Sequence, residues 1–116
     1  VVSSTTHTNA GTYSDTVTYT DGTGKYLNAS KVVKSDILKA TVTITGNGLN
    51  GRGYFGTYDG QAHAATATVT GVGGVSLGLV VSSTTHTNAG TYSDTVTFLG
   101  DANYLVASKV LKSDII

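Results

Sequence analysis

VVSSTTHTNAGTYSDTVT occupies residues 1–18, and the same eighteen letters return unchanged at residues 80–97. The likeness extends over 1–38 and 80–116, with one residue lost in the loop that follows the identical stretch. Because residue 1 recurs as residue 80, the period is about 79 residues. This period is longer than that of a solenoid repeat and suits a small domain arrayed in tandem.

A different segment, residues 39–79, lies between the two copies, so the chain holds one and a half repeats. No linker rich in Pro, Gly or Ser separates the parts, and only Lys39-Ala40 stands between one apparent strand and the next. A junction this short restricts bending between domains. We therefore expect tandem copies to form a stiff rod.

The composition excludes several classes of function. The formal net charge is zero, which argues against nucleic acid or an anionic membrane as the main partner. The chain has no Cys, so it has no disulfide and no thiolate metal site. Its apolar stretches are too short to cross a bilayer, and we expect no membrane insertion.

Alternation of apolar residues with Thr predicts strands at 41–45, 65–70 and 94–98. Strand-like runs continue at 75–84 and 105–116, and clusters of Gly, Asn and Asp separate the runs. We expect about five to seven short strands per repeat and no helix longer than a turn. The predicted fold is all-β, a small antiparallel β-sandwich of the immunoglobulin-like kind repeated in tandem, with a β-grasp-like domain as the alternative.

The motif NAGTY stands at residues 88–92 and again at 9–13. A polar residue and a Gly form a tight corner there, and a Tyr then enters a strand and can bond back to the corner's backbone. This is the arrangement of the tyrosine corner in immunoglobulin-like sandwiches. The alternative is an ordinary strand start with a buried Tyr. The corner residues are Asn9, Gly11, Tyr13, Asn88, Gly90 and Tyr92.

Several motifs follow one another in the second part of the chain: Thr57-Tyr58-Asp59-Gly60-Gln61-Ala62-His63, then AATATVTG at 64–71, NAGTY at 88–92 and Gly100-Asp101-Ala102-Asn103-Tyr104. In this order they resemble the YDG or MBG class of tandem domains in large bacterial surface proteins and adhesins. The resemblance covers 39–116, and fragments recur in 1–38. Two departures are the long Gly-rich insert at 46–56 and the varied GDANY motif in the first copy.

The resemblance places a repeat boundary between Leu38 and Lys39. Residues 39–116 are then one complete repeat, and residues 1–38 are the C-terminal half of the one before. It also implies an extracellular or bacterial cell-surface location and a role in stalks, filaments or adhesive arrays, whose partners are adjacent repeats or other copies. It implies no known active site.

Two short motifs match enzyme signatures by letters alone. Residues 74–78 spell G-x-S-x-G, which needs a strand, a sharp turn and a helix in a parallel α/β sheet. Residues 46–51 spell G-x-G-x-x-G, but a poor helix-forming stretch follows. His63 and His86 lack further metal ligands at suitable spacing. We expect no catalytic residue, cofactor or metal, and no enzyme activity.

The loop at 46–56 is the candidate surface for an external partner. Arg52, Tyr54 and Phe55 supply a cation and two aromatic rings, the residue types found at interface anchors. One hypothesis is therefore an adhesive module that binds a host or matrix glycan or protein. In the alternative, the aromatic rings enter the core and Arg52 is solvated.

Residues 1–38 lack the strands that 39–79 would supply, which leaves open sheet edges. We expect this half repeat to stay disordered, to complete itself on a neighbouring copy, or to belong to a longer continuous fibre. The favoured function is a structural stalk or fibre module, assembled by strand complementation or as a continuous tandem array.

Overall fold

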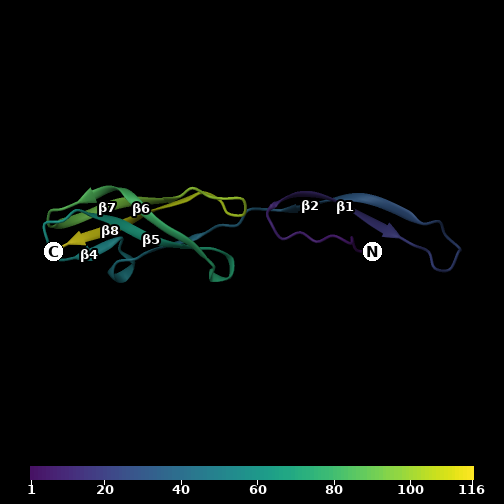
Figure 1. Cartoon of the computed structure of the whole chain (residues 1–116), viewed down its shortest axis with the longest axis horizontal. Coiled ribbons are helices and arrows are strands. Elements are labelled where there is room, and N and C mark those ends of the chain that lie inside the picture. The colour runs from purple at the N-terminus through teal and green to yellow at the C-terminus, as the bar shows by residue number, and fades with distance from the viewer. The chain divides into compact units, whose positions relative to one another are not determined.

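The computed structural model describes residues 1–116 and is all-β, as the alternation of apolar residues with Thr predicted. The chain divides into two compact units, residues 1–39 and residues 40–116. The division falls one residue after the boundary expected at Leu38/Lys39. Figure 1 shows the first unit in purple to blue and the second in teal to yellow.

The first unit is a two-stranded antiparallel hairpin made of β1 (Gly11–Tyr19) and β2 (Ala29–Ile37). Gly11 pairs with Ile37 at one end and Tyr19 pairs with Ala29 at the other. No apolar side chain of this unit is buried, whereas the carboxylate residue Asp15 is 6% exposed. The hairpin therefore presents its apolar face uncovered.

The second unit contains six strands, within the expected range. They are β3 (Thr43–Gly46), β4 (Tyr54–Gly56), β5 (His63–Thr70), β6 (Ser76–His86), β7 (Gly90–Phe98) and β8 (Ala107–Ile115). One sheet has the order β3-β5-β6 and the other has the order β4-β8-β7. The only helical segments are single 3-10 turns, η1 (Leu49–Gly51) and η2 (Val72–Gly74). None of the helices is long and apolar enough to cross a membrane.

One strand pair departs from the antiparallel arrangement that the sequence predicts. β4 pairs with β8 in parallel, over three residues from Tyr54↔Ser113 to Gly56↔Ile115. A parallel bridge between Ala40 and Tyr104 precedes it. The chain from Ala40 to β4 thus runs beside β8 in the same direction, although β3 within it pairs with β5 of the other sheet.

The core of the second unit lies between the two sheets. Its buried members are Ile44, Ala65, Ala67 and Val69 from β3 and β5, and Val96 and Leu111 from β7 and β8. Within β5 the buried residues are every second one, as expected for a strand with one covered face. Because all three buried residues of β5 are Ala or Val, which are small, the two sheets approach closely.

Gly53 shows how close this approach is. A Cβ atom at this position would lie 2.4 Å from the Cβ of Ala65 and 3.3 Å from the Cβ of Leu111. The amide of Gly53 donates to the carbonyl of Lys112 at 2.8 Å, while its carbonyl accepts from the amide of Thr66 at 3.0 Å. Gly53 therefore joins β5 to β8 through its backbone, at a place where no side chain fits.

The hairpins of the two units have the same register. β7 and β8 pair from Gly90↔Ile115 to Phe98↔Ala107, at the positions that correspond to the two ends of the β1–β2 pairing. The single-residue deletion lies in the loop between the strands, so it does not change which residues face each other.

Candidate functional site

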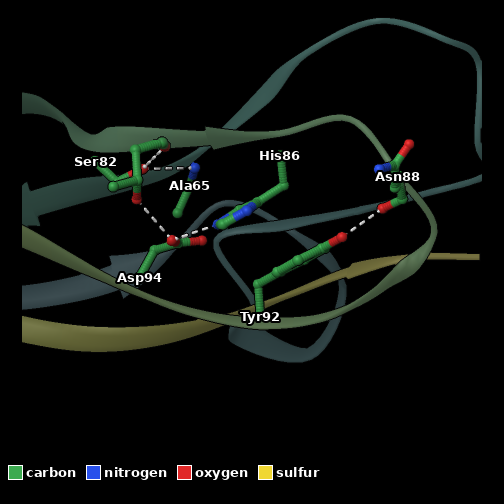
Figure 2. A network of polar contacts seen from close by, with 7 residues as sticks. Ala65, Ser82, His86, Asn88, Tyr92 and Asp94 are labelled. Atoms are coloured by element: carbon green, nitrogen blue, oxygen red, sulfur yellow. Dashed lines mark hydrogen bonds and ion pairs between the residues drawn. The ribbon is translucent and has the colours of Figure 1, made fainter.

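Both corner motifs lie at the start of the first strand of a hairpin. In the second unit the hydroxyl of Tyr92 donates to the backbone carbonyl of Asn88 at 2.7 Å, across Gly90. The ring of Tyr92 also stacks on the imidazole of His86, with centroids 3.8 Å apart and planes 9° apart. Figure 2 shows the two rings lying flat against each other, with the Tyr92 hydroxyl pointing at Asn88.

His86 connects this corner to a buried carboxylate. Its Nε2 lies 2.7 Å from Oδ1 of Asp94, and the hydroxyl of Thr84 donates to the same oxygen at 2.8 Å. Asp94 is 3% exposed, on the covered face of β7 together with Val96. The interaction joins β6 to β7, the strands that come from different sheets.

The carboxylate of Asp94 stays ionised despite its burial. Burial raises its pKa, but the hydrogen bonds from His86 and Thr84, the charge of His86 and the hydroxyl of Ser113 together outweigh burial, so the pKa is lowered from its ordinary value. The network thus holds a negative charge inside the unit through donors to Oδ1, while Oδ2 is buried without a hydrogen-bond partner.

Ser82 extends the network to β5. Its hydroxyl donates to the carbonyl of Thr84 at 2.8 Å and accepts from the amide of Ala65 at 3.1 Å. The β5–β6 register shifts between Ala64 and Thr66, so Ala65 lies at the irregularity and Ser82 supplies an acceptor there. Figure 2 shows Ser82 between Ala65 and the Asp94 side of the network.

The first unit contains the same corner. Nε2 of His7 lies 2.6 Å from Oδ1 of Asp15, which also accepts from the hydroxyl of Thr5 at 2.8 Å. The rings of His7 and Tyr13 stack at 3.8 Å, and the Tyr13 hydroxyl donates to the carbonyl of Asn9 at 2.7 Å. Hydrogen bonds from His7 and Thr5 lower the pKa of Asp15 from its ordinary value. The corner forms without a covering sheet.

This arrangement joins strands through side chains that bond to one another. The imidazole of His86 has a carboxylate at Nε2 and a ring across its face, and the hydroxyl of Ser82 has partners on both sides. No group of three or more His, Asp or Glu side chains is placed to hold a metal ion. The interactions of the site thus connect β5, β6 and β7 at the corner.

The structure does not gather the three loop residues named as a partner-binding surface. Arg52 Nε donates to Oδ2 of Asp114 at 2.5 Å, and its guanidinium carbon lies 5.6 Å from the centre of the Phe55 ring. The Arg52 guanidinium lowers the pKa of Asp114 from its ordinary value. Tyr54 instead stacks on His63, with ring centroids 4.1 Å apart.

Arg52 and Tyr54 thus have partners within the unit, and Phe55, at 38% exposed, is the most accessible of the loop's aromatic rings. In one alternative Arg52 was expected to be solvated, but its side chain pairs with Asp114. The two residues are 62 positions apart in the chain, so the pairing depends on the β4–β8 contact.

Sequence reasoning missed the carboxylate and the imidazole at the centre of the network. One signal was present in the sequence. Asp94 and Val96 are two positions apart in an alternating run, so both side chains lie on the same, buried face of the strand. His86 and Asp94 also recur together as His7 and Asp15.

Comparisons of the chain with family models, with characterised proteins and with solved structures find no match.

Proposed function

We propose that this chain is a structural repeat module of a stalk or fibre on the outside of a bacterial cell. The observation that carries the proposal is the recurrence of one corner at the repeat period. His86, Asp94 and Tyr92 have the same partners, with distances within about 0.1 Å, as their counterparts 79 residues earlier. Polar side chains that bond to one another, and that recur in each copy of the repeat, suit a role in stabilising the fold of that copy.

The finer fold that fits this role is an immunoglobulin-like sandwich. A Tyr at a strand start that bonds back to the backbone four residues earlier, as Tyr92 does, is a feature of such sandwiches. Two three-stranded sheets that share one small core support the same assignment. We extend it to a tandem array because the second half of the repeat occurs twice.

The short connection between the units supports a stiff array. β2 ends at Ile37 and the second unit begins at Ala40, so few residues are available to act as a hinge. The external location and the bacterial source rest on the resemblance to YDG or MBG domains. Adjacent repeats or other copies of the chain are its proposed partners, and the proposal gives it no catalytic role, cofactor or nucleic-acid partner.

Solution scattering tests the proposal on engineered chains that carry one, two, three or four copies of the 79-residue period. A stalk module predicts a maximum dimension that grows by a constant step with each added copy. A matched control series carries a flexible Gly-Ser linker at Lys39-Ala40, which should make the growth fall below linear. Equal curves for both series, or a compact particle for the unmodified one, would contradict the proposal.

The second candidate is an adhesive module, and one observation favours it. Phe55 and Leu49 are both exposed on the loop that contains Arg52, and exposed apolar side chains beside a cation suit an interface. In a glycan-array and host-matrix binding screen, this function predicts a signal that Phe55→Ala removes. The matched control is Val72→Ala, which changes an exposed apolar residue in another loop. A blank screen for the unmodified chain would reject this candidate.

A further inference from the structure

The apolar face of the first unit is uncovered at the positions that form the core of the second. Val96, Leu111 and Ile115 are 0%, 3% and 4% exposed. The corresponding residues of the first hairpin are Val17, Val33 and Ile37, and none of them is buried. Since the two hairpins share one register, the difference comes from what covers them.

Residues 40–79 provide that cover in the second unit. Along β8, the ammonium group of Lys109 donates to the carbonyl of Ile44 at 3.0 Å, and Asp114 accepts from Arg52. The carbonyl of Lys112 accepts from Gly53, and β4 then pairs with the end of β8. On β6, Ser82 accepts from Ala65.

The first unit repeats every one of these receiving groups. Lys109, Lys112, Asp114 and Ser82 correspond to Lys31, Lys34, Asp36 and Ser3, with no change of residue type. Ser113 and Ile115, which pair with β4, correspond to Ser35 and Ile37. The surface that recognises residues 40–79 is therefore present twice.

A groove marks the place that β3 would occupy. In the first unit it is lined by Val17, Tyr19 and residues 29–31, with Val1 beside them. In the second unit the corresponding residues of β8, 107–109, border a hollow together with residues 42–44, and Lys109 there donates to the carbonyl of Ile44. The groove of the first unit thus lies where residues 42–44 border β8 in the complete unit.

We propose that residues 1–38 form a binding surface for a polypeptide segment with the chemistry of residues 40–79, supplied from outside residues 1–116. The segment adds a parallel strand beside β2, seats an Ile44-type residue over Val17, and places an Arg52-type guanidinium on Asp36. Backbone pairing along an open strand edge provides affinity, and the side-chain pairs set the register.

The chain's own residues 40–79 cannot bind this surface in the same way. In the second unit Ala40 lies beside Tyr104, before β8 begins, and the nine residues of β8 span roughly 30 Å. The counterpart of Tyr104 is Tyr26, at the opposite end of the hairpin from Lys39. Since Lys39 and Ala40 are adjacent, with Cα atoms about 3.8 Å apart, the segment would start at the wrong end.

A second copy of residues 1–116 is not the occupant either. Each copy has two receiving hairpins and one 40–79 segment, and that segment already covers the copy's own β7–β8 hairpin. Exchange between copies would leave as many hairpins open as before. The occupant is a segment of this type that is free of its own hairpin.

This inference rests on the proposed role as a repeat module, because only a repetitive protein supplies such segments. The two are tested by different measurements. Scattering can show that tandem copies do not form a rod although residues 1–38 still bind the peptide. Conversely, the peptide can fail to bind although tandem copies form a rod.

The test titrates the full chain, isotopically labelled, with a peptide of residues 40–79 fused to a soluble carrier, which prevents aggregation of the peptide. The expected result is a saturable complex of one to one, with amide shifts and slowed hydrogen exchange at Val17, Val33 and Ile37 and unchanged signals from β7 and β8. Carrier alone is the blank.

Two variants of the chain provide a matched pair. Val17→Lys puts a charge on the binding face and should weaken binding at least about tenfold, whereas Thr16→Lys puts the same charge on the opposite face and should leave binding unchanged. A charge swap tests the register: an Arg52→Asp peptide should lose binding to the unmodified chain and regain it with Asp36→Arg.

Three results would overturn the proposal. These are no binding of the unmodified peptide, equal binding by both Lys variants, or shifts in β7 and β8 that show replacement of the chain's own segment. Self-association of the chain without peptide, with protection of Val17, would identify a second copy as the occupant and would equally overturn it.

Discussion

The hairpins β1–β2 and β7–β8 have nearly the same sequence and the same register, yet they differ in burial. Val96 is fully buried in β7, and its counterpart Val17 in β1 is partly exposed. The His–Asp–Tyr corner, in contrast, is complete in both. The corner is therefore a local structure, whereas the core requires the segment 40–79.

The carboxylates show the same division. Asp15 is 6% exposed and Asp94 is 3% exposed, although only Asp94 lies under a second sheet. The side chains that hydrogen-bond to Oδ1 of each carboxylate come from within ten positions along the chain. A hairpin can therefore bury its polar corner alone but leaves its apolar face to a partner.

Separating residues 40–79 from the second hairpin should change the stability of the chain most. Gly53→Ala places a methyl group 2.4 Å from the Cβ of Ala65, so β5 and β8 must separate. We expect the second unit to lose about 3 kcal/mol of unfolding free energy. Residue-level hydrogen exchange should show β8 opening as readily as β2, with β1 and β2 unchanged.

Gly22→Ala is the matched control, because a Cβ at Gly22 has no neighbour within 4 Å. If the amides of β8 exchange equally slowly in the Gly53→Ala variant and in the unmodified chain, close contact with residues 40–79 is not the cause of the difference between the two hairpins.

The next effect compares identical residues in the two hairpins. Val96→Ala removes two buried methyl groups, with an expected cost of about 2 kcal/mol in the second unit. Val17→Ala should cost the first unit less than about 1 kcal/mol, since Val17 is already partly solvated. Thermal unfolding followed by NMR at each hairpin provides both values, and similar costs would show that burial is not the difference.

Removal of the corner hydroxyl should affect both hairpins alike. Tyr92→Phe and Tyr13→Phe each delete a hydrogen bond of 2.7 Å to a backbone carbonyl, with an expected cost of about 1 kcal/mol. Unfolding of each hairpin in urea measures the change. A much larger cost for Tyr92 would mean that the corner depends on the covering sheet and is not local.

The smallest effect is a pH dependence shared by both corners. The pKa values of Asp15 and Asp94 are lower in the folded state than the ordinary 3.8. Their contribution to stability is therefore present above that value and is lost as the pH falls through the folded-state pKa. We expect thermal stability to be level above about pH 5 and to fall below it.

Asp94→Asn should flatten the acid-side slope of the second unit, and Asp15→Asn should do so in the first. Asp101→Asn is the control, because this carboxylate lies in an exposed loop away from the corners. If the two corner variants keep the slope of the unmodified chain, the corner carboxylates do not govern the acid response.

The features that sequence reasoning could reach are those that local patterns encode. Alternation with Thr predicted the strands around Ile44, Val69 and Val96, and all three residues are buried. The bond from Tyr92 to Asn88 joins residues four positions apart, within the reach of a local motif. The all-β class follows from the same short-range information.

The remaining features depend on contacts between distant parts of the chain. β4 has three residues, too few to show any alternation, and nothing in Tyr54-Phe55-Gly56 encodes a parallel partner more than fifty residues away. The pairing of Arg52 with Asp114 follows from that contact. The stack of Tyr54 on His63 likewise requires the turn that brings β5 back beside β4.

The parallel course of residues 40–56 beside β8 also determines how the second unit meets a pulling force. Ala40 bridges to Tyr104 before β8 begins, and the amide of Ile116, just after β8, donates to the carbonyl of Gly56 at 2.9 Å. Tension applied at residues 40 and 116 acts along β8, while the hydrogen bonds to β4 and β7 lie across it. Such a load shears the hydrogen bonds between residues 40–56 and β8 together instead of breaking them one after another.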